Sequence, residues 1–215
     1  IGDNILDGGI GTDTIYSGAG SDTVVIRTGD GSTTLDNADV VADFTDGSDV
    51  LGMASVAFDD LTIGQGFGSY ASHTLISITS SGEYLAILQN ITASNITALD
   101  FASTSTSSQT LSGTSGNNTL IGGAGNDTLT TGTGNDTLLA SAGDDAITVD
   151  GTGNKIIHGG SGTDSLTVSF SGITSLANYT ISVSGDYMVL TDSSGNTIKY
   201  KNIESLTVGS YTYSE

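Results

Sequence analysis

The sequence contains no cysteine and very few basic residues. Without cysteine there is no disulfide framework, and oxidising surroundings are tolerated. Four Lys and Arg residues against 24 Asp and Glu residues give a formal net charge of −20. A chain this acidic repels nucleic acid and anionic membrane surfaces, and it resists compaction unless counter-ions bind. No apolar run approaches the length of a membrane span, so we expect neither membrane insertion nor a nucleic-acid partner.

Catalytic side chains are also scarce. The histidines are His73 and His158, far apart in sequence, and the glutamates are Glu83, Glu204 and Glu215. The sequence has no H-E-x-x-H motif, no G-x-S-x-G motif and no phosphate-binding P-loop. His158 falls at an outward strand position of the repeat described below, where we expect a surface residue. The sequence therefore predicts that this chain is not an enzyme.

What the chain has in abundance is glycine, 31 residues, much of it in a nine-residue unit. The unit has glycine at position 4, usually an acidic residue at position 6 and an apolar residue at position 8. In the first block these positions read Gly2-Asn4-Leu6, Gly11-Asp13-Ile15 and Gly20-Asp22-Val24, then a degenerate fourth turn, Gly31-Thr33-Leu35. In the second block they read Gly116-Asn118-Leu120, Gly125-Asp127-Leu129, Gly134-Asp136-Leu138, Gly143-Asp145-Ile147, Gly153-Lys155-Ile157 and Gly162-Asp164-Leu166. Self-similarity at a short fixed period predicts a solenoid.

The period sets the geometry of that solenoid. Glycine permits a tight reversal, so each unit makes one turn and one short strand, and two units make one coil. Residues eighteen apart then stack about 4.8 Å from one another, the spacing of neighbouring strands. Position 8 is expected to point inward and to form a continuous apolar ladder, while the threonines at positions 7 and 9 point outward.

This stacking creates an electrostatic conflict. Asp127, Asp145 and Asp164 fall on one edge of the coil, and Asn118, Asp136 and Lys155 fall on the other. Like charges at this spacing repel by ~1–4 kcal/mol per pair at effective dielectric constants of about 80 to 20. A hard cation bound by carboxylates and turn carbonyls removes the repulsion, and calcium accepts irregular oxygen cages better than magnesium does. The sequence therefore predicts several calcium ions.

The predicted calcium ligands follow from position in the repeat. At position 6 they are Asn4, Asp13, Asp22, Asn118, Asp127, Asp136, Asp145 and Asp164. Turn glycines expected to contribute carbonyl oxygens are Gly9, Gly11, Gly18, Gly20, Gly123, Gly125, Gly132, Gly134, Gly143, Gly160 and Gly162. Lys155 leaves two alternatives open. Its ammonium replaces an ion beside Asp136, or the slipped turn points it at solvent; on either reading this step lacks a normal calcium ion.

The repeats resemble the RTX (repeats-in-toxin) family, whose motif is G-G-x-G-x-D-x-U-x. Residues 8–16 and 159–167 match that motif at every specified position. The resemblance implies a parallel β-roll, calcium-induced folding and export by a type I secretion system. Residues 43–51 resemble the acidic segment that often closes such coils, so Asp43 and Asp49 join the expected calcium ligands. The chain departs from the motif's aspartate at Asn4, Thr33, Asn118 and Lys155.

The predicted fold class is all-β, with two parallel β-roll blocks, each followed by a capping set of antiparallel strands. The expected divisions are a first roll at 1–38, a cap at 39–101, a linker at 102–110, a second roll at 111–170 and a C-terminal cap at 171–215. Alternating apolar and polar residues predict cap strands at 74–78 and 84–88, and a hairpin of 179–183 with 187–191. Because Ile1 falls in mid-repeat, we expect a processed product or a piece of a larger protein.

Three functions remain open from the sequence. The first is a structural module of an extracellular surface or matrix protein, such as an S-layer subunit, adhesin or filament, that assembles with copies of itself. The second is the carboxy-terminal calcium and secretion module of an exported hydrolase or toxin. The third is ice binding, but only residues 133–135 and 152–154 show the outward Thr-x-Asn pairing that it needs, so the row is too short.

Overall fold

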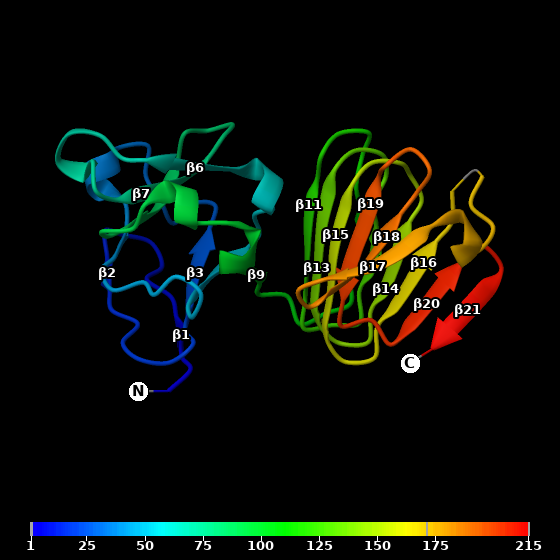
Figure 1. Cartoon of the computed structure of the whole chain (residues 1–215). Coiled ribbons are helices and arrows are strands. Elements are labelled where there is room, and N and C mark those ends of the chain that lie inside the picture. The colour runs from blue at the N-terminus through cyan, green and yellow to red at the C-terminus, as the bar shows by residue number, and fades with distance from the viewer. Residues whose placement is uncertain (1, 171, 215) are drawn as a thin grey trace. The chain divides into compact units, whose positions relative to one another are not determined.

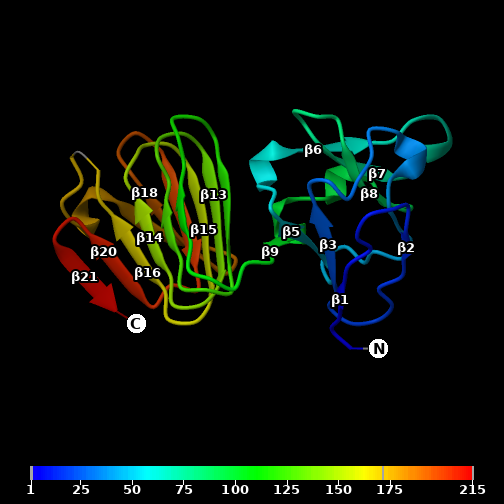
Figure 2. The same cartoon turned by 180° about the vertical axis from the view of Figure 1, so that it is seen from behind.

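A computed structural model describes residues 2–170 and 172–214. The chain forms two compact units, Ile1–Thr104 and Ser105–Glu215, each of which is described by itself. Strands dominate both units (Figures 1 and 2), and the described residues contain short 3-10 turns but no α-helix. Among those residues there is also no helix with the length and apolar character needed to cross a membrane. The predicted all-β class is confirmed.

The second unit is a coil built from two facing sheets. One sheet has the order β10 (Thr110–Ser112), β12 (Thr128–Thr130), β14 (Ala146–Val149), β16 (Ser165–Val168), β20 (Ser205–Val208) and β21 (Tyr211–Ser214). The other has the order β11 (Thr119–Gly123), β13 (Asp136–Ala142), β15 (Lys155–Ser161), β19 (Thr197–Lys201), β18 (Tyr187–Thr191) and β17 (Thr180–Ser184). Leu129 pairs with Ile147 in parallel, which is the predicted spacing of eighteen residues.

The core of this coil is the predicted apolar ladder. Leu129, Leu138, Ile157 and Leu166 are fully buried, and Ile147 is nearly so. They belong to one cluster that continues into the cap. Because alternate residues of a strand point to opposite faces, the register that buries position 8 also fixes which residues lie in the stacked turns.

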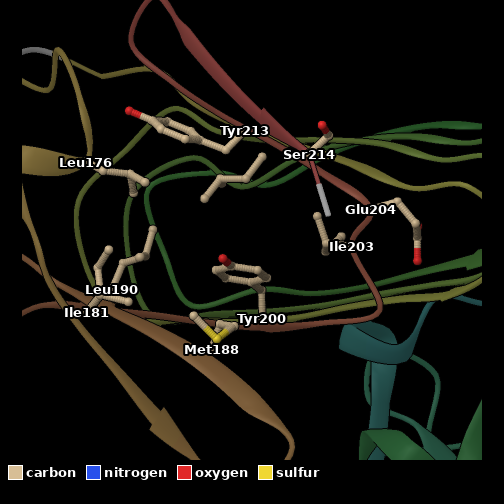
Figure 3. Close-up of a pocket in the computed structure, with 10 residues that line it drawn as sticks. Leu176, Ile181, Met188, Leu190, Tyr200, Ile203, Glu204, Tyr213 and Ser214 are labelled. Carbon is tan, nitrogen blue, oxygen red and sulfur yellow. The ribbon is translucent and has the colours of Figure 1, made fainter.

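The cap of the second unit adds one more coil to the β-roll and also contains antiparallel strands. The predicted hairpin is confirmed as β17 and β18, which pair antiparallel. We expected residues 171–215 to form a cap of antiparallel strands. Instead β19 and β20 pair in parallel with β15 and β16 and add a further coil, because their backbones satisfy the edge of the last repeat. Side chains of the cap line an apolar hollow there (Figure 3).

The first unit is smaller and less regular. Its parallel sheet has the order β1 (Ile5–Leu6), β3 (Thr23–Arg27), β5 (Val50–Ala54) and β9 (Phe101–Ser103). Its second sheet has the order β2 (Thr14–Ile15), β4 (Val40–Val41), β8 (Tyr84–Leu88), β7 (Thr74–Ile78) and β6 (Leu61–Gln65). The strands predicted at 74–78 and 84–88 are confirmed as β7 and β8, an antiparallel pair.

The predicted fourth turn of the first block, Gly31-Thr33-Leu35, is wrong. Leu35 begins a 3-10 turn, and Ser32 bridges to Tyr84 of β8. The chain loops outward after β3 and returns at Val40, which pairs with Thr14 across 26 residues in place of eighteen. The segment pairs with β8 through Ser32 and Tyr84 and does not join the stacked turns.

The predicted linker at 102–110 is shorter in the structure. Its first residues belong to β9, which pairs with β5 of the first unit. Its last residue, Thr110, begins β10 and pairs with Thr128 of the second unit. Serine and threonine suit the edge of a strand as well as a linker, so composition alone did not place these boundaries.

Candidate metal centre

The acidic residues of the second unit form a hydrogen-bonded stack along one edge. The backbone N–H of Asp127 donates to Asp145 Oδ1 at 2.6 Å, and the N–H of Asp145 donates to Asp164 Oδ1 at 2.9 Å. One oxygen of each carboxylate therefore ties its turn to the turn before it. The predicted stacking of these three aspartates is present in the structure.

The second oxygen of these carboxylates is the unusual one. Oδ2 of Asp145 and Oδ2 of Asp164 are buried without a hydrogen-bond partner, and so is Oδ2 of Asp22 in the first unit. Burial raises the pKa of Asp145, and it raises the pKa of Asp164 to about 6, with Asp145 and Glu204 adding repulsion. A buried polar group left unpaired costs ~1–3 kcal/mol, and more when it is charged.

Two glycines allow the Oδ2 atoms of Asp127 and Asp164 to approach the backbone closely. A Cβ on Gly122 would collide with Asp127 Oδ2 and with the carbonyl of Ala140 in the next coil. A Cβ on Gly159 would collide with Asp164 Oδ2 and with the carbonyl of Asn202. The first glycine of the repeat therefore lets a carboxylate oxygen of its own turn and a carbonyl oxygen of the next coil come close together beside its Cα.

Lys155 shows how a cation is held by a position-6 carboxylate and the turn carbonyls around it. Its side chain is fully buried, which decides between the two alternatives left open by the sequence. Nζ lies 2.6 Å from Asp136 Oδ2 and 2.7 Å from the carbonyl oxygen of Gly134. It also donates to the carbonyls of Gly132 and Thr152, each at 3.1 Å. The ammonium is thus surrounded by oxygens from two successive turns.

The contacts of Lys155 define a set of oxygen ligands, and the strand register repeats this set at other turns. One turn gives the carbonyls of positions 2 and 4 and the carboxylate of position 6, and the following turn gives the carbonyl of position 3. Among the described residues no three acidic or imidazole side chains converge, so backbone carbonyls must complete each cage. Oxygen-only cages of this kind suit a hard cation such as calcium.

Comparison with known proteins identifies the repeats. The family model of the RTX calcium-binding nonapeptide repeat matches residues 1–24, 108–148 and 149–168, with four copies. The two blocks are RTX repeats. The matched repeats are of a calcium-binding kind. A search of curated proteins gave no match.

One solved structure similar to this chain is an extracellular lipase, LipA, from Serratia marcescens. It is 30% identical over 42% of this chain, with a TM-score of 0.37. The match spans only 14% of the length of that lipase chain.

In the first unit the RTX aspartates are held in the same way. The N–H of Asn4 donates to Asp22 Oδ1 at 2.8 Å, and the N–H of Asp22 donates to Asp49 Oδ1 at 3.0 Å. Asp49 thus continues the stack, but its Oδ2 already accepts the Thr45 N–H at 2.8 Å. Asp13 donates its N–H to Asp39 Oδ1 at 2.9 Å and so forms the other edge.

Asp43 plays a different part from the stacked aspartates. Its Oδ1 accepts the Ser17 N–H at 2.8 Å, and its Oδ2 accepts the Gly18 N–H at 3.0 Å. Both oxygens therefore close a turn of the RTX block through protein donors. The carbonyl of Gly20, another predicted ligand, accepts the Ser48 hydroxyl at 2.8 Å.

The remaining predicted ligands lie in the stacked turns. The N–H of Asn118 donates to Asp136 Oδ1 at 2.9 Å, but its own Oδ1 accepts the Thr114 N–H within the same turn. Asp127 Oδ2 accepts the Gly123 N–H at 2.7 Å. Positive φ values, for which glycine is suited, occur at Gly9, Gly11, Gly18, Gly20, Gly132, Gly134, Gly143, Gly160 and Gly162. At Gly125 a side chain would collide with the backbone of Ser107 and Ser108.

Sequence reasoning missed two acids of these stacks, Asp39 and Glu204. Each accepts the backbone N–H of a repeat aspartate, Asp13 and Asp164 respectively. A signal for Glu204 was present, because residues 204–208 read Glu-Ser-Leu-Thr-Val where residues 164–168 read Asp-Ser-Leu-Thr-Val. Both acids follow turns of irregular length, which the nine-residue period does not detect.

His158 is less exposed than predicted. Its Nε2 is hydrogen-bonded to the Tyr187 hydroxyl, and its ring lies 5.3 Å from that of Tyr187. Burial, with a smaller effect of the nearby Lys201 charge, lowers the pKa of His158 to about 4. The imidazole is therefore neutral at pH 7 and packs between cap and coil. His73 Nδ1 accepts the Asn90 N–H at 3.1 Å.

We expect Asp145→Ala to weaken calcium-induced folding far more than Asn118→Ala. Asp145 links two successive steps of its stack and has a buried unpartnered oxygen, whereas the Asn118 side chain serves its own exposed turn. The midpoint of a calcium titration followed by circular dichroism measures the difference. Equal midpoints for the two variants would contradict the assignment of the stack.

We expect Lys155→Met to destabilise the folded chain by ~3–5 kcal/mol, because the buried carboxylate of Asp136 would lose its counter-charge. Urea unfolding at saturating calcium measures the loss, with the outward Lys199→Met as the matched control. The Lys155→Asp variant should be destabilised in the absence of calcium and should regain stability as the calcium concentration is raised. A Lys155→Asp variant indifferent to calcium would contradict the view that the ammonium takes an ion's place.

Without calcium, we expect the second unit to be more stable at pH 5 than at pH 7. The pKa of Asp164 is about 6 in the fold and lies near its ordinary 3.8 in the unfolded chain. The folded state therefore binds the proton more tightly, and its contribution to stability is lost as pH rises through about 6. Unfolding in EDTA, with sucrose to populate the fold, measures this slope. Asp164→Asn should flatten the slope, and an unchanged slope would contradict this account.

Proposed function

We propose that this chain is a structural module of a secreted surface or matrix protein that folds when calcium binds. The observation that carries the proposal is the set of buried, unpartnered oxygens of Asp22, Asp145 and Asp164. A fold that buries such oxygens at strand spacing opposes itself until cations enter. The alternating turns of the RTX repeat supply the remaining ligands.

Calcium then acts as a folding switch. Where calcium is scarce, the stacked carboxylates and the backbone entropy of 31 glycines keep the chain unfolded. Outside the cell, sites of this kind bind with dissociation constants of ~10⁻⁴–10⁻³ M. Each site stabilises the fold by about 1.4 kcal/mol at tenfold excess of calcium over its dissociation constant. Several sites together move a marginal chain from mostly unfolded to mostly folded. We propose export by type I secretion for the same reason.

Self-assembly is the second part of the proposal. β17 and β21 are the outermost strands of the two sheets at the cap of the second unit. Val183 on β17 is 69% exposed, and Tyr211 on β21 is 58% exposed. Outermost strands present unpaired backbone groups that can pair with another chain. At the start of the first unit, β1 is likewise outermost and its Ile5 is 79% exposed. We propose that copies join through these strands once calcium has folded them.

A catalytic role is not part of the proposal. His158 is neutral and engaged by Tyr187, and His73 accepts a backbone N–H, so both histidines serve packing or turn structure. The alternative function is the calcium and secretion module of a type I-exported hydrolase or toxin. That alternative requires folding on calcium and no assembly.

Light scattering and sedimentation during calcium addition to the EDTA-treated chain test the proposal. We expect particles to grow with calcium and not with magnesium. Val183→Lys combined with Tyr211→Lys should stop growth and leave the circular dichroism transition intact, because charged edge strands resist pairing. The wild-type chain remaining a monomer at every concentration would overturn self-assembly and favour the secretion module.

A further inference from the structure

The turn between β19 and β20 is a shortened form of the repeat turn. β15 and β19 pair as far as His158 and Lys201, and β16 and β20 resume at Ser165 and Ser205. Residues 159–164 of the last RTX turn are therefore faced by only residues 202–204 of the cap. Asn202 adopts a left-handed conformation, with φ of 53°, to make this tight reversal.

Glu204 ends this short turn in the place of the repeat aspartate. The N–H of Asp164 donates to Glu204 Oε2 at 2.6 Å, as the N–H of Asp127 donates to Asp145 Oδ1. The N–H of Glu204 also donates to the Asp164 carbonyl at 3.1 Å, so the short turn lies directly against the last repeat turn. Figure 3 shows Glu204 at one side of the apolar hollow, with its carboxylate directed away from Leu190 and Tyr200.

A buried oxygen without a partner lies at this junction. Asp164 is 1% exposed, and its Oδ2 accepts no hydrogen bond. A Cβ on Gly159 would collide with this oxygen and with the Asn202 carbonyl, so the two oxygens lie close together beside the Cα of Gly159. By the register of the Lys155 cage, Asp164 Oδ2 belongs to the step that follows its own turn, which is the step to Glu204.

We propose that Asp164, Glu204 and the Asn202 carbonyl hold a calcium ion at the junction between the last RTX coil and the cap. Asn202 and Glu204 lie outside the residues matched by the repeat family. Two carboxylates and a carbonyl form the irregular oxygen set that calcium accepts and magnesium does not. The ion fixes the cap to the roll, so that calcium controls the cap as well as the repeats. This inference rests on the calcium-dependent folding proposed above.

Counting bound ions by native mass spectrometry, with calorimetry of the full chain, tests the site. Glu204→Gln keeps an acceptor for the Asp164 N–H and removes the charge. Asp186→Asn is the matched control, because Asp186 is an exposed acid in the turn between β17 and β18 of the same cap. We expect Glu204→Gln to bind one ion fewer, or to bind one ion at least tenfold more weakly, a loss typical of disturbed metal sites. Asp186→Asn should match the wild type.

Each outcome has a distinct meaning. Equal ion counts and affinities for Glu204→Gln and the wild type would overturn the junction site and leave the repeat sites standing. Binding of no calcium by the wild-type chain would overturn the proposed function itself. If Glu204→Gln fails to fold, Glu204→Asp serves as a second variant, because it keeps the charge and leaves Asn202 and Ile203 unchanged. Its shorter side chain should weaken the binding of one calcium ion, while the other ions bind with normal affinity. Unchanged binding by Glu204→Asp would also count against the site.

Discussion

The whole structure depends on repulsion between carboxylates held at the spacing of parallel strands. The register that buries Leu129, Ile147 and Leu166 also places Asp127, Asp145 and Asp164 above one another. The acids cannot move apart without exposing the core, and we propose that the core forms only when a cation relieves their repulsion. In this proposal folding and cation binding are two aspects of one equilibrium, as expected when ligands converge only in the folded state.

Lys155 meets the same constraint without an external ion. Its ammonium carries one charge and three donors, and it takes oxygens from two successive turns. Calcium carries two charges and takes six to eight oxygens, which suits steps where both turns contribute a carboxylate. The edge that holds Asp136 thus has a permanent cation at one step. The edge that holds Asp145 and Asp164 has no such cation among the described residues, and it is there that we propose calcium binds.

The repeat made much of this fold predictable, because position 8 and position 6 recur in fixed phase. The inward ladder, the eighteen-residue register and the stack of Asp127, Asp145 and Asp164 all follow from that phase. Asp39 and Glu204 were not predicted as members of the stacks, because they end turns of irregular length that depart from the nine-residue period. The segment 31–35 kept the glycine and apolar spacing but lacked the acid, and tertiary pairing with Tyr84 decided its structure. The burial of Lys155 depended on where a slipped turn pointed, which spacing alone does not fix.

The most direct test is circular dichroism of the EDTA-stripped chain during a calcium titration, with magnesium as the control. Our account predicts a coil-to-β transition with calcium near ~10⁻⁴–10⁻³ M and no transition with magnesium at the same concentrations. A full β signal in EDTA, or an equal transition with magnesium, would contradict the claim that the stacked carboxylates require calcium to fold.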